Sequence, residues 1–240
     1  MMKKPGIAYE FNPGIMYPAF LTRSRLLRGI AKYAPELSGR LMDFGCGAKP
    51  YRSLFDVREY IGIDYENPGH PHVNEQIDVF YDGKHIPFAD ETFDSVFSSE
   101  VLEHVFDPDI VLKELNRVLV PGGKMLATCP FAICEHEIPN DFARYSSYGL
   151  RHLFEKHGFE VLQQDKTGNN VETVFQLWIM YIHQHINPYF RNIPVLRSAF
   201  RFITYTSLNL LALFFNKILP DRRDLYLNNV IVCKKIKGIQ

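Results

Sequence analysis

Leu41-Met42-Asp43-Phe44-Gly45-Cys46-Gly47-Ala48 is the stretch that decides the fold. A short apolar strand passes an acidic residue and enters a turn with two glycines one residue apart. Glycine has no Cβ and tolerates a positive φ, so Gly45 and Gly47 let the backbone pass close to a ligand. Nucleotide-type ligands bind at such turns, beyond the first strand of a doubly wound sheet. The stretch therefore predicts an α/β fold with a ligand at this turn.

The same turn argues against two other nucleotide motifs. The dinucleotide fingerprint, G-x-G-x-x-G or G-x-G-x-x-A, needs a small residue where this chain has Pro50. A proline there does not fit a helix packed closely on the strand, which disfavours NAD and FAD. The sequence also lacks G-x-x-x-x-G-K-[ST], so the turn is not a phosphate-binding P-loop.

A second acidic residue follows the turn about twenty residues along the chain. Residues 60–64, Tyr-Ile-Gly-Ile-Asp, have the pattern of a second strand that ends in a carboxylate. An acid at this distance is placed to accept hydrogen bonds from ribose hydroxyls. Asp64 taken alone is more often a strand-end cap, so its weight comes from its combination with Asp43 and the glycine turn.

Three further motifs follow in order: Asp82-Gly83-Lys84-His85-Ile86-Pro87-Phe88-Ala89-Asp90, then Ser99-Glu100-Val101-Leu102-Glu103-His104-Val105, then Leu115-Asn116-Arg117-Val118-Leu119-Val120-Pro121-Gly122-Gly123-Lys124. With the glycine turn, they resemble the motifs of class I S-adenosylmethionine-dependent methyltransferases, most closely the type 11 group. The resemblance covers roughly residues 40–165 and the final strand. It implies a Rossmann-like α/β fold: a seven-stranded, mostly parallel sheet with an antiparallel last strand and a helical insertion.

The resemblance also implies roles for individual residues toward S-adenosyl-L-methionine. The turn glycines approach its methionyl part, Asp43 holds its amino end and Asp64 binds its ribose. Asp82 accepts from the adenine amino group while Gly83 offers a backbone N–H, with Asp78 as a competing candidate for the adenine contact. The predicted cofactor-binding residues are thus Asp43, Gly45, Gly47, Asp64, Asp82 and Gly83, together with Ser99 and Glu100 at the carboxyl end of the fourth strand.

The methyl acceptor is expected to meet the segment after the fifth strand, residues 135–146, which is polar and ionisable between two apolar elements. Asp141, Arg144 and Tyr145 are the candidate substrate residues, although a loop held by Asp141–Arg144 pairing explains them equally well. A hydroxyl acceptor needs a base or a metal, whereas an amine or thiolate does not. His136 is the first candidate base and His104 the second.

Composition limits the alternatives. Of 240 residues, 27 are Lys or Arg and 27 are Asp or Glu, so no overall basic field gathers nucleic acid, and nucleic-acid substrates are not expected. The four cysteines show no C-x-x-C spacing, and His70 and His72 have no partner at metal-ligand spacing, so no metal is expected. Reduced thiols and the absence of a secretory pattern favour a cytoplasmic protein.

Two segments lie outside the minimal fold of the single predicted domain, residues 1–240. Residues 1–35 are expected to form an N-terminal cap, and residues 171–219 a helical insertion between the last two strands. The uncharged run in the second helical pattern of the insertion, residues 203–215, is shorter than a membrane span needs. The insertion therefore has three alternatives: it caps the acceptor pocket, forms a homodimer face, or contacts a membrane surface without crossing it.

These observations together predict an enzyme, a methyltransferase (EC 2.1.1) that acts on a small molecule. O-methylation of a sugar, glycan or natural-product acceptor is the expected reaction. The alternative is a non-catalytic S-adenosylmethionine-binding or scaffold protein with the same fold.

Overall fold

The structure is a computed structural model that describes residues 6–65 and 75–236. His70 and His72 lie outside the described residues. Contacts divide the chain into two compact units, which are described separately. The first comprises residues 1–28, 131–134 and 166–228, and the second comprises residues 29–130, 135–165 and 229–240. The prediction of a single domain over residues 1–240 stays a prediction.

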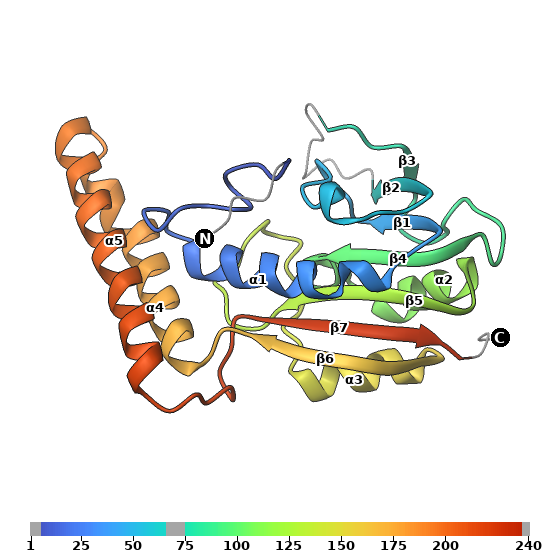
Figure 1. Cartoon of the computed structure of the whole chain (residues 1–240). Helices are drawn as coiled ribbons and strands as arrows, with labels where there is room; N and C mark the ends of the chain where they lie inside the picture. Colours follow the sequence, from blue (N-terminus) through green and yellow to red (C-terminus); the bar gives the residue numbers. More distant parts are fainter. Residues whose placement is uncertain (1–5, 66–74, 237–240) are drawn as a thin grey trace. The chain divides into compact units, whose positions relative to one another are not determined.

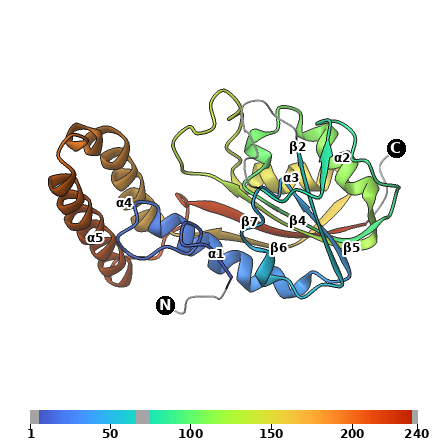
Figure 2. The ribbon, with the colours of Figure 1, turned by 90° about the horizontal axis from the view of Figure 1, so that it is seen from above.

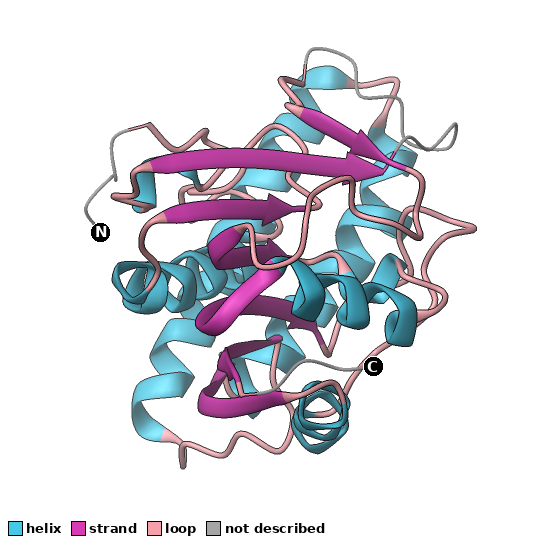
Figure 3. Ribbon diagram, turned by 90° about the vertical axis from the view of Figure 1, so that its right-hand side faces the viewer, coloured by secondary structure: helices cyan, strands magenta, loops and turns pink. Residues whose placement is uncertain are grey.

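The second unit is built on a seven-stranded sheet with the order β3-β2-β1-β4-β5-β7-β6, whose strands run side by side in Figure 3. The strands are β1 (Arg40–Phe44), β2 (Glu59–Tyr65), β3 (Val79–Tyr81), β4 (Phe93–Ser99), β5 (Leu119–Pro130), β6 (Phe159–Thr167) and β7 (Asn228–Lys235). β1 pairs in parallel with both β2 and β4, and β4 with β5. β7 runs antiparallel to its neighbours (Figure 1). The predicted fold is confirmed.

The sheet carries helices α2 (Pro108–Val118) and α3 (Ser147–Lys156), which lie on the same face (Figure 2). Asp107 caps α2 and Pro108 occupies its first turn, where the missing N–H costs nothing. Ser146 caps α3 by accepting from the Gly149 N–H at 3.1 Å. Buried side chains of the central strands and these helices form one core, including Phe93, Val96, Leu112, Leu115 and Phe154. Five of the seven residues of β4 are buried, as expected for a strand covered on both faces.

The start of β5 is unusual. Proline and glycine are typical of turns, and Pro121-Gly122-Gly123 would be expected to lie between a helix and a strand. Instead β5 begins at Leu119 and runs through these residues. The register explains the difference: Phe93 pairs with Leu119 but Ser95 pairs with Lys124, so the Pro-Gly-Gly segment forms a bulge inside the strand.

The first unit contains the helices between β6 and β7. They are α4 (Asn170–Tyr181), the short turns η4 (Ile182–Ile186) and η5 (Asn187–Phe190), and α5 (Pro194–Ile218). α4 and α5 lie side by side in Figures 1 and 2, and Ile179, Ile182 and Tyr205 are buried between them. The placement of helices between the last two strands agrees with the predicted insertion.

Polar contacts hold the same unit together. Arg25, from helix α1 (Phe20–Tyr33), forms a buried ion pair with Glu172 at the start of α4. Asn209 of α5 donates to the carbonyl oxygen of Ile15 at 2.8 Å, and Gln176 of α4 donates to that of Pro18 at 2.8 Å. The backbone carbonyl groups of residues 15–18 therefore accept hydrogen bonds from side chains of both α4 and α5.

α5 is longer than the uncharged run from which the sequence expectation was drawn. It spans 25 residues, and by length and composition alone it could cross a membrane. Only 17% of its most apolar 18-residue stretch is buried. The helix length therefore does not exclude a span, in contrast to the sequence expectation.

Candidate active site

The glycine turn follows β1 at the point where the strand order reverses, between β1 and β4. Gly45 has φ +71° and Gly47 has φ +44°, a region that side-chain-bearing residues rarely adopt. A Cβ on Gly45 would lie 2.3 Å from a methyl carbon of Val101, so no larger residue fits. Among the described residues, a Cβ on Gly47 would meet only Glu75, at 3.6 Å. Close approach of a ligand to the backbone at Gly47 stays a prediction.

Asp64 of β2 and Asp78, which directly precedes β3, support this turn. The Gly47 N–H donates to Oδ2 of Asp64 at 2.7 Å, so the carboxylate lies directly beside the turn. Asp78 accepts from the Gly62 N–H and pairs with Lys49 Nζ, both at 2.6 Å. These contacts give Asp78 a structural role. Asp64 is therefore the better placed of the two for an external ligand.

Asp82 and Gly83 follow β3 and turn the chain. Oδ1 of Asp82 accepts the N–H groups of Lys84 and His85 at 2.8 and 2.7 Å, and the side chain is exposed. Gly83 has φ +81°. Because Asp78 is engaged by Gly62 and Lys49, Asp82 is the stronger of the two adenine candidates, and this role stays a prediction.

Asp43 is nearly inaccessible at the end of β1, with 3% of its surface exposed. The Tyr60 hydroxyl donates a short hydrogen bond to Oδ2 of Asp43. Burial raises the pKa of the Asp43 carboxyl to about 7, although the hydrogen bond from Tyr60 opposes this shift. The carboxyl is therefore poised between its neutral and ionised forms at neutral pH.

Ser99 and Glu100 end β4 and bond to the neighbouring strand. Ser99 Oγ lies 2.9 Å from Thr128 Oγ1, which in turn donates to Glu100 at 2.8 Å. Glu100 has φ +58°, an unusual conformation for a residue with a Cβ. It redirects the chain from the strand into the short helix η3 (Leu102–His104).

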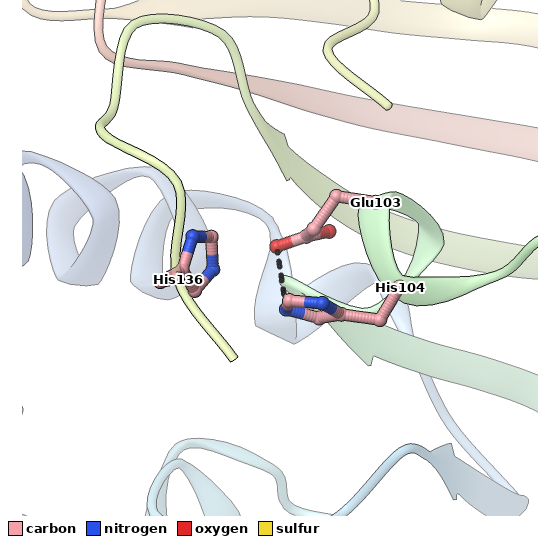
Figure 4. Close-up of side chains that lie close together, drawn as sticks. All are labelled: Glu103, His104 and His136. Atoms are coloured by element: carbon pink, nitrogen blue, oxygen red, sulfur yellow. Dashed lines mark ion pairs between the residues drawn. The ribbon is translucent and has the colours of Figure 1, made fainter. Parts of the chain in front are cut away.

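Three ionisable side chains gather just beyond β4, as Figure 4 shows. Glu103 and His104 come from η3, and His136 comes from the segment after β5. Their ligand-type atoms all lie within 4.8 Å of one another. The two imidazole rings meet edge to face, with centroids 4.8 Å apart. The two candidate bases predicted from sequence are thus brought together in space.

Glu103 is the member of this cluster that the sequence did not single out. Its side chain is fully buried, and Oε1 has no hydrogen-bond partner in the described part of the chain. Burial raises the pKa of the Glu103 carboxyl well above its usual range, and the charge of Glu100 adds to this effect. A carboxyl group in this state is expensive unless something binds to it.

The two histidines are held from behind. His104 Nδ1 donates to the carbonyl oxygen of Asn140 at 2.7 Å, and its Nε2 lies 3.8 Å from Glu103 Oε1. His136 Nδ1 accepts from Arg144 Nη2 at 3.4 Å and lies 3.4 Å from Asp141 Oδ2, which also accepts the backbone N–H of His136 at 2.9 Å. The Asn140 carbonyl therefore orients the ring of His104, and Arg144 and Asp141 orient that of His136.

The candidate substrate residues form a supporting layer next to this cluster. Arg144 holds Asp141 through two bonds of 2.5 and 2.6 Å, and this hydrogen bonding lowers the pKa of Asp141 to about 2. Tyr145 packs against the core. The structure shows the pairing of Asp141 with Arg144 that was the alternative explanation of this loop. Direct contacts of Asp141, Arg144 and Tyr145 with a substrate stay a prediction.

Comparison with known proteins identifies this arrangement. Residues 42–127 match the methyltransferase domain family Methyltransf_11. The match places a methyltransferase domain of this family at residues 42–127, about a third of the chain. The predictions of family, enzyme class and cofactor are confirmed at this level.

The relatives of this chain differ in the share of their length that aligns with it. A Mycolicibacterium smegmatis protein described as a probable S-adenosylmethionine-dependent methyltransferase is 32% identical over 143 residues, 54% of this chain and 56% of that protein. The O-methyltransferase cnsE of Penicillium expansum is 23% identical over 197 residues, 72% and 71% of the two chains. Several other curated relatives, among them C-methyltransferases of ubiquinone and menaquinone biosynthesis, align over less than a third of their length.

Solved structures support the fold. One similar structure is a complex that contains the Haloferax volcanii Trm112 methyltransferase activator. A chain of this complex superimposes on the present chain with a TM-score of 0.54 at 18% identity, and the alignment covers 99% of the present chain and 100% of the other. At this identity the likeness concerns the fold alone.

The residues at the turn have the chemistry that the predicted cofactor roles require. The backbone at Gly47 and the acidic side chain of Asp43 stand at the end of β1, and their contacts with the methionyl part of S-adenosylmethionine stay predictions. The carboxylate of Asp64, beside the turn, has acceptor capacity for ribose hydroxyls. S-adenosylmethionine supplies an electrophilic methyl group on a sulfonium, so the protein's tasks are alignment and exclusion of water.

We expect the affinity of the methyltransferase for S-adenosylmethionine to rise between about pH 5.5 and about pH 7.5. The cationic amino group favours the ionised form of Asp43, whose pKa in the free protein is about 7. Below that pKa, binding must first remove a proton, so Kd falls by up to about tenfold per pH unit as pH rises, and it levels off above the pKa. Calorimetric titration across this range measures the slope.

Asp43→Asn is the matched control for this pH dependence, because it keeps the shape of the side chain and removes its titration. The variant should bind more weakly and with a flat pH profile over the same range. An equal slope in the wild type and in Asp43→Asn would assign the titration to another group.

Proposed function

We propose that this protein transfers the methyl group of S-adenosylmethionine to a hydroxyl group of a small-molecule acceptor of sugar, glycan or natural-product type. The observation that carries the proposal is the position of the Glu103–His104–His136 cluster. Val101 packs against the Gly45 turn, and Glu103 and His104 follow it within three residues. A proton-accepting cluster therefore adjoins the cofactor turn, where an acceptor hydroxyl must lie.

The chemistry of the cluster favours a hydroxyl over an amine. A neutral amine already has a reactive lone pair, whereas a hydroxyl becomes a good nucleophile only as it loses its proton. His136 is the proposed base, with His104 as the second candidate, because both rings are held on their Nδ1 side, by Arg144 and by the Asn140 carbonyl respectively. In the transfer, the oxygen–methyl bond forms as the sulfur–methyl bond breaks, and the hydroxyl proton passes to the cluster.

Acceptor class is tested by measuring the release of S-adenosylhomocysteine with panels of hydroxylated sugars, phenols and amines. We expect turnover with a hydroxylated acceptor, and His136→Gln should lower kcat about a hundredfold or more while the Kd of S-adenosylmethionine stays unchanged. His152→Gln, an exposed histidine on α3, is the matched control. Turnover restricted to amines, or a His136→Gln variant with normal kcat, would contradict the proposal.

Cofactor binding without turnover on any panel would favour the scaffold alternative. A cytoplasmic location and the absence of nucleic-acid substrates stay predictions.

A further inference from the structure

We infer that the cluster at the end of β4 is a divalent-cation site formed by Glu103, His104 and His136, with Glu137 as a fourth donor. The first three offer ligand atoms within 4.8 Å of one another. Glu137 Oε2 lies 3.8 Å from His104 Nε2, the same distance as Glu103 Oε1. His104 Nε2 thus faces two carboxylates. No metal site was predicted from the sequence, because Glu103 and His104 lie far along the chain from His136 and do not form a metal-ligand motif of closely spaced residues.

Glu103 supplies independent evidence for a bound cation. Its side chain is fully buried, yet Oε1 accepts no hydrogen bond in the described residues. In Figure 4 one oxygen of this carboxyl group points toward the two imidazole rings, and a dashed line joins it to His104. A buried carboxyl oxygen without a hydrogen bond is costly, and coordination of a cation is one of the ways to offset that cost.

The surroundings of His104 match those of a metal ligand. A ligating imidazole almost always donates its other ring N–H to a carbonyl or carboxylate, which fixes the ring and makes it more basic. His104 shows this pattern, because its Nδ1 donates to the Asn140 carbonyl oxygen at 2.7 Å. His136 is held differently: its Nδ1 accepts from Arg144 Nη2 at 3.4 Å and lies 3.4 Å from Asp141 Oδ2. Arg144 neutralises Asp141, so this charge does not compete for the cation.

Two imidazoles with one or two carboxylates suit Zn²⁺ and the other first-row divalent ions, rather than Ca²⁺ or Mg²⁺ with their preference for oxygen. This inference deepens the proposed function, on which its catalytic consequence rests. A cation here would bind the acceptor oxygen and favour loss of its proton, with solvent accepting that proton. The two histidines would then be ligands and not bases.

The test is metal binding by the full-length protein without acceptor or turnover. Protein freed of metal with a chelator is titrated with Co²⁺, whose visible absorption reports nitrogen and oxygen ligands, and then with Zn²⁺ in competition. We expect one ion per chain with a Kd in the micromolar range or below. Glu103→Gln, His104→Ala and His136→Ala should each weaken binding at least tenfold.

His152→Ala is the matched control and should bind the ion normally, because this exposed histidine lies on α3. Circular dichroism of each variant checks that it is folded, and Glu137→Gln provides a milder change at the half-exposed donor. Millimolar or absent Co²⁺ binding by the wild type, or equal binding by wild type and all cluster variants, would overturn the metal site. Neither result depends on whether an acceptor has been found.

A separate feature, the helical pair of the first unit, carries a second inference: we propose that α4 and α5 bind an anionic lipid surface. Large apolar side chains on α5 are exposed at positions that recur every four or seven residues, as on one face of a helix. They are Leu196, Ile203, Leu210, Phe214 and Ile218. Tyr205, Asn209 and Ala212 lie on the opposite, buried face.

The charge of the helical pair favours a membrane as the binding partner of the exposed apolar face of α5. Residues 173–220 contain no Asp or Glu, and their basic residues are Arg191, Arg197, Arg201 and Lys217. Trp178 and Tyr181 of α4, stacked on each other, are about half exposed. Apolar side chains, interfacial aromatic rings and an exclusively basic charge are the properties of helices that lie in the headgroup region of anionic membranes.

Cosedimentation with lipid vesicles tests the surface. The full-length protein should bind vesicles of 70% phosphatidylcholine and 30% phosphatidylglycerol. Binding should be at least tenfold weaker to vesicles of pure phosphatidylcholine, and at least tenfold weaker to the mixed vesicles in 0.5 M NaCl. Ile203→Glu/Phe214→Glu should lower binding at least tenfold, whereas Tyr148→Glu, at an equally exposed ring on α3, should not. Absence of vesicle binding, or a stable dimer in light scattering that binds no vesicles, would overturn the proposal.

Discussion

Asp64→Ala is expected to weaken binding of S-adenosylmethionine by about a hundredfold. The carboxylate accepts the Gly47 N–H at 2.7 Å through Oδ2 and the Tyr65 N–H at 2.8 Å through Oδ1, and each oxygen keeps acceptor capacity for a ribose hydroxyl. A hydrogen bond to a charged group contributes about 1.5–3 kcal/mol, so two of them account for about two orders of magnitude in Kd. Calorimetric titration with S-adenosylmethionine and S-adenosylhomocysteine measures the loss.

Two further variants separate ribose binding from support of the turn. Asp64→Asn keeps one carbonyl oxygen for the Gly47 N–H and should lose less affinity than Asp64→Ala. Glu160→Ala removes an acid on β6 that pairs with Lys234 and should bind normally. Wild-type affinity in Asp64→Ala would exclude Asp64 from the cofactor site.

The position of the cofactor site was predictable because it follows from topology. Strand patterns around Asp43, Asp64 and Ser99 indicated three strands, and parallel neighbours end at the same edge of a sheet. Once β1, β2 and β4 are adjacent, these carboxyl ends must converge. The glycine turn was predictable for the same reason, because only glycine occupies φ values of +71° and +44° without strain.

The Glu103–His104–His136 cluster was only partly predictable. Both histidines were candidates, but burial of Glu103 depends on η3, a single turn whose inward side no sequence period reveals. His136 reaches η3 because the N–H groups of Phe142 and Ala143 donate to the Glu103 carbonyl oxygen at 2.8 and 3.2 Å. Backbone hydrogen bonds between distant segments leave no residue signature.

The helical pair shows another limit of sequence reasoning. The sequence located an insertion at residues 171–219 and left pocket capping, dimerisation and membrane contact as alternatives. An apolar pattern alone does not separate buried from exposed faces when a helix is apolar on most sides. The structure provides this separation, because Tyr205, Asn209 and Ala212 are buried whereas 62% of Ile203 is exposed.

Gly45→Ala is expected to destabilise the fold by about 3 kcal/mol and to abolish measurable cofactor binding. A left-handed conformation costs an L-residue about 1–2 kcal/mol. The new Cβ would also lie 2.3 and 2.8 Å from the two methyl carbons of Val101, so the turn or the end of β4 must shift. Urea unfolding followed by circular dichroism measures the stability, and titration measures binding.

A double-mutant cycle with Val101→Ala separates the two costs. Removing the methyl carbons of Val101 leaves its Cβ 3.1 Å from the new atom, which is tight but tolerable. The double variant should therefore lose less stability than the sum of the single variants, and the residual loss is the cost of the positive φ at Gly45. Strict additivity would show that Val101 does not confine the turn, and it would remove the contact that places the Glu103–His104–His136 cluster beside the cofactor.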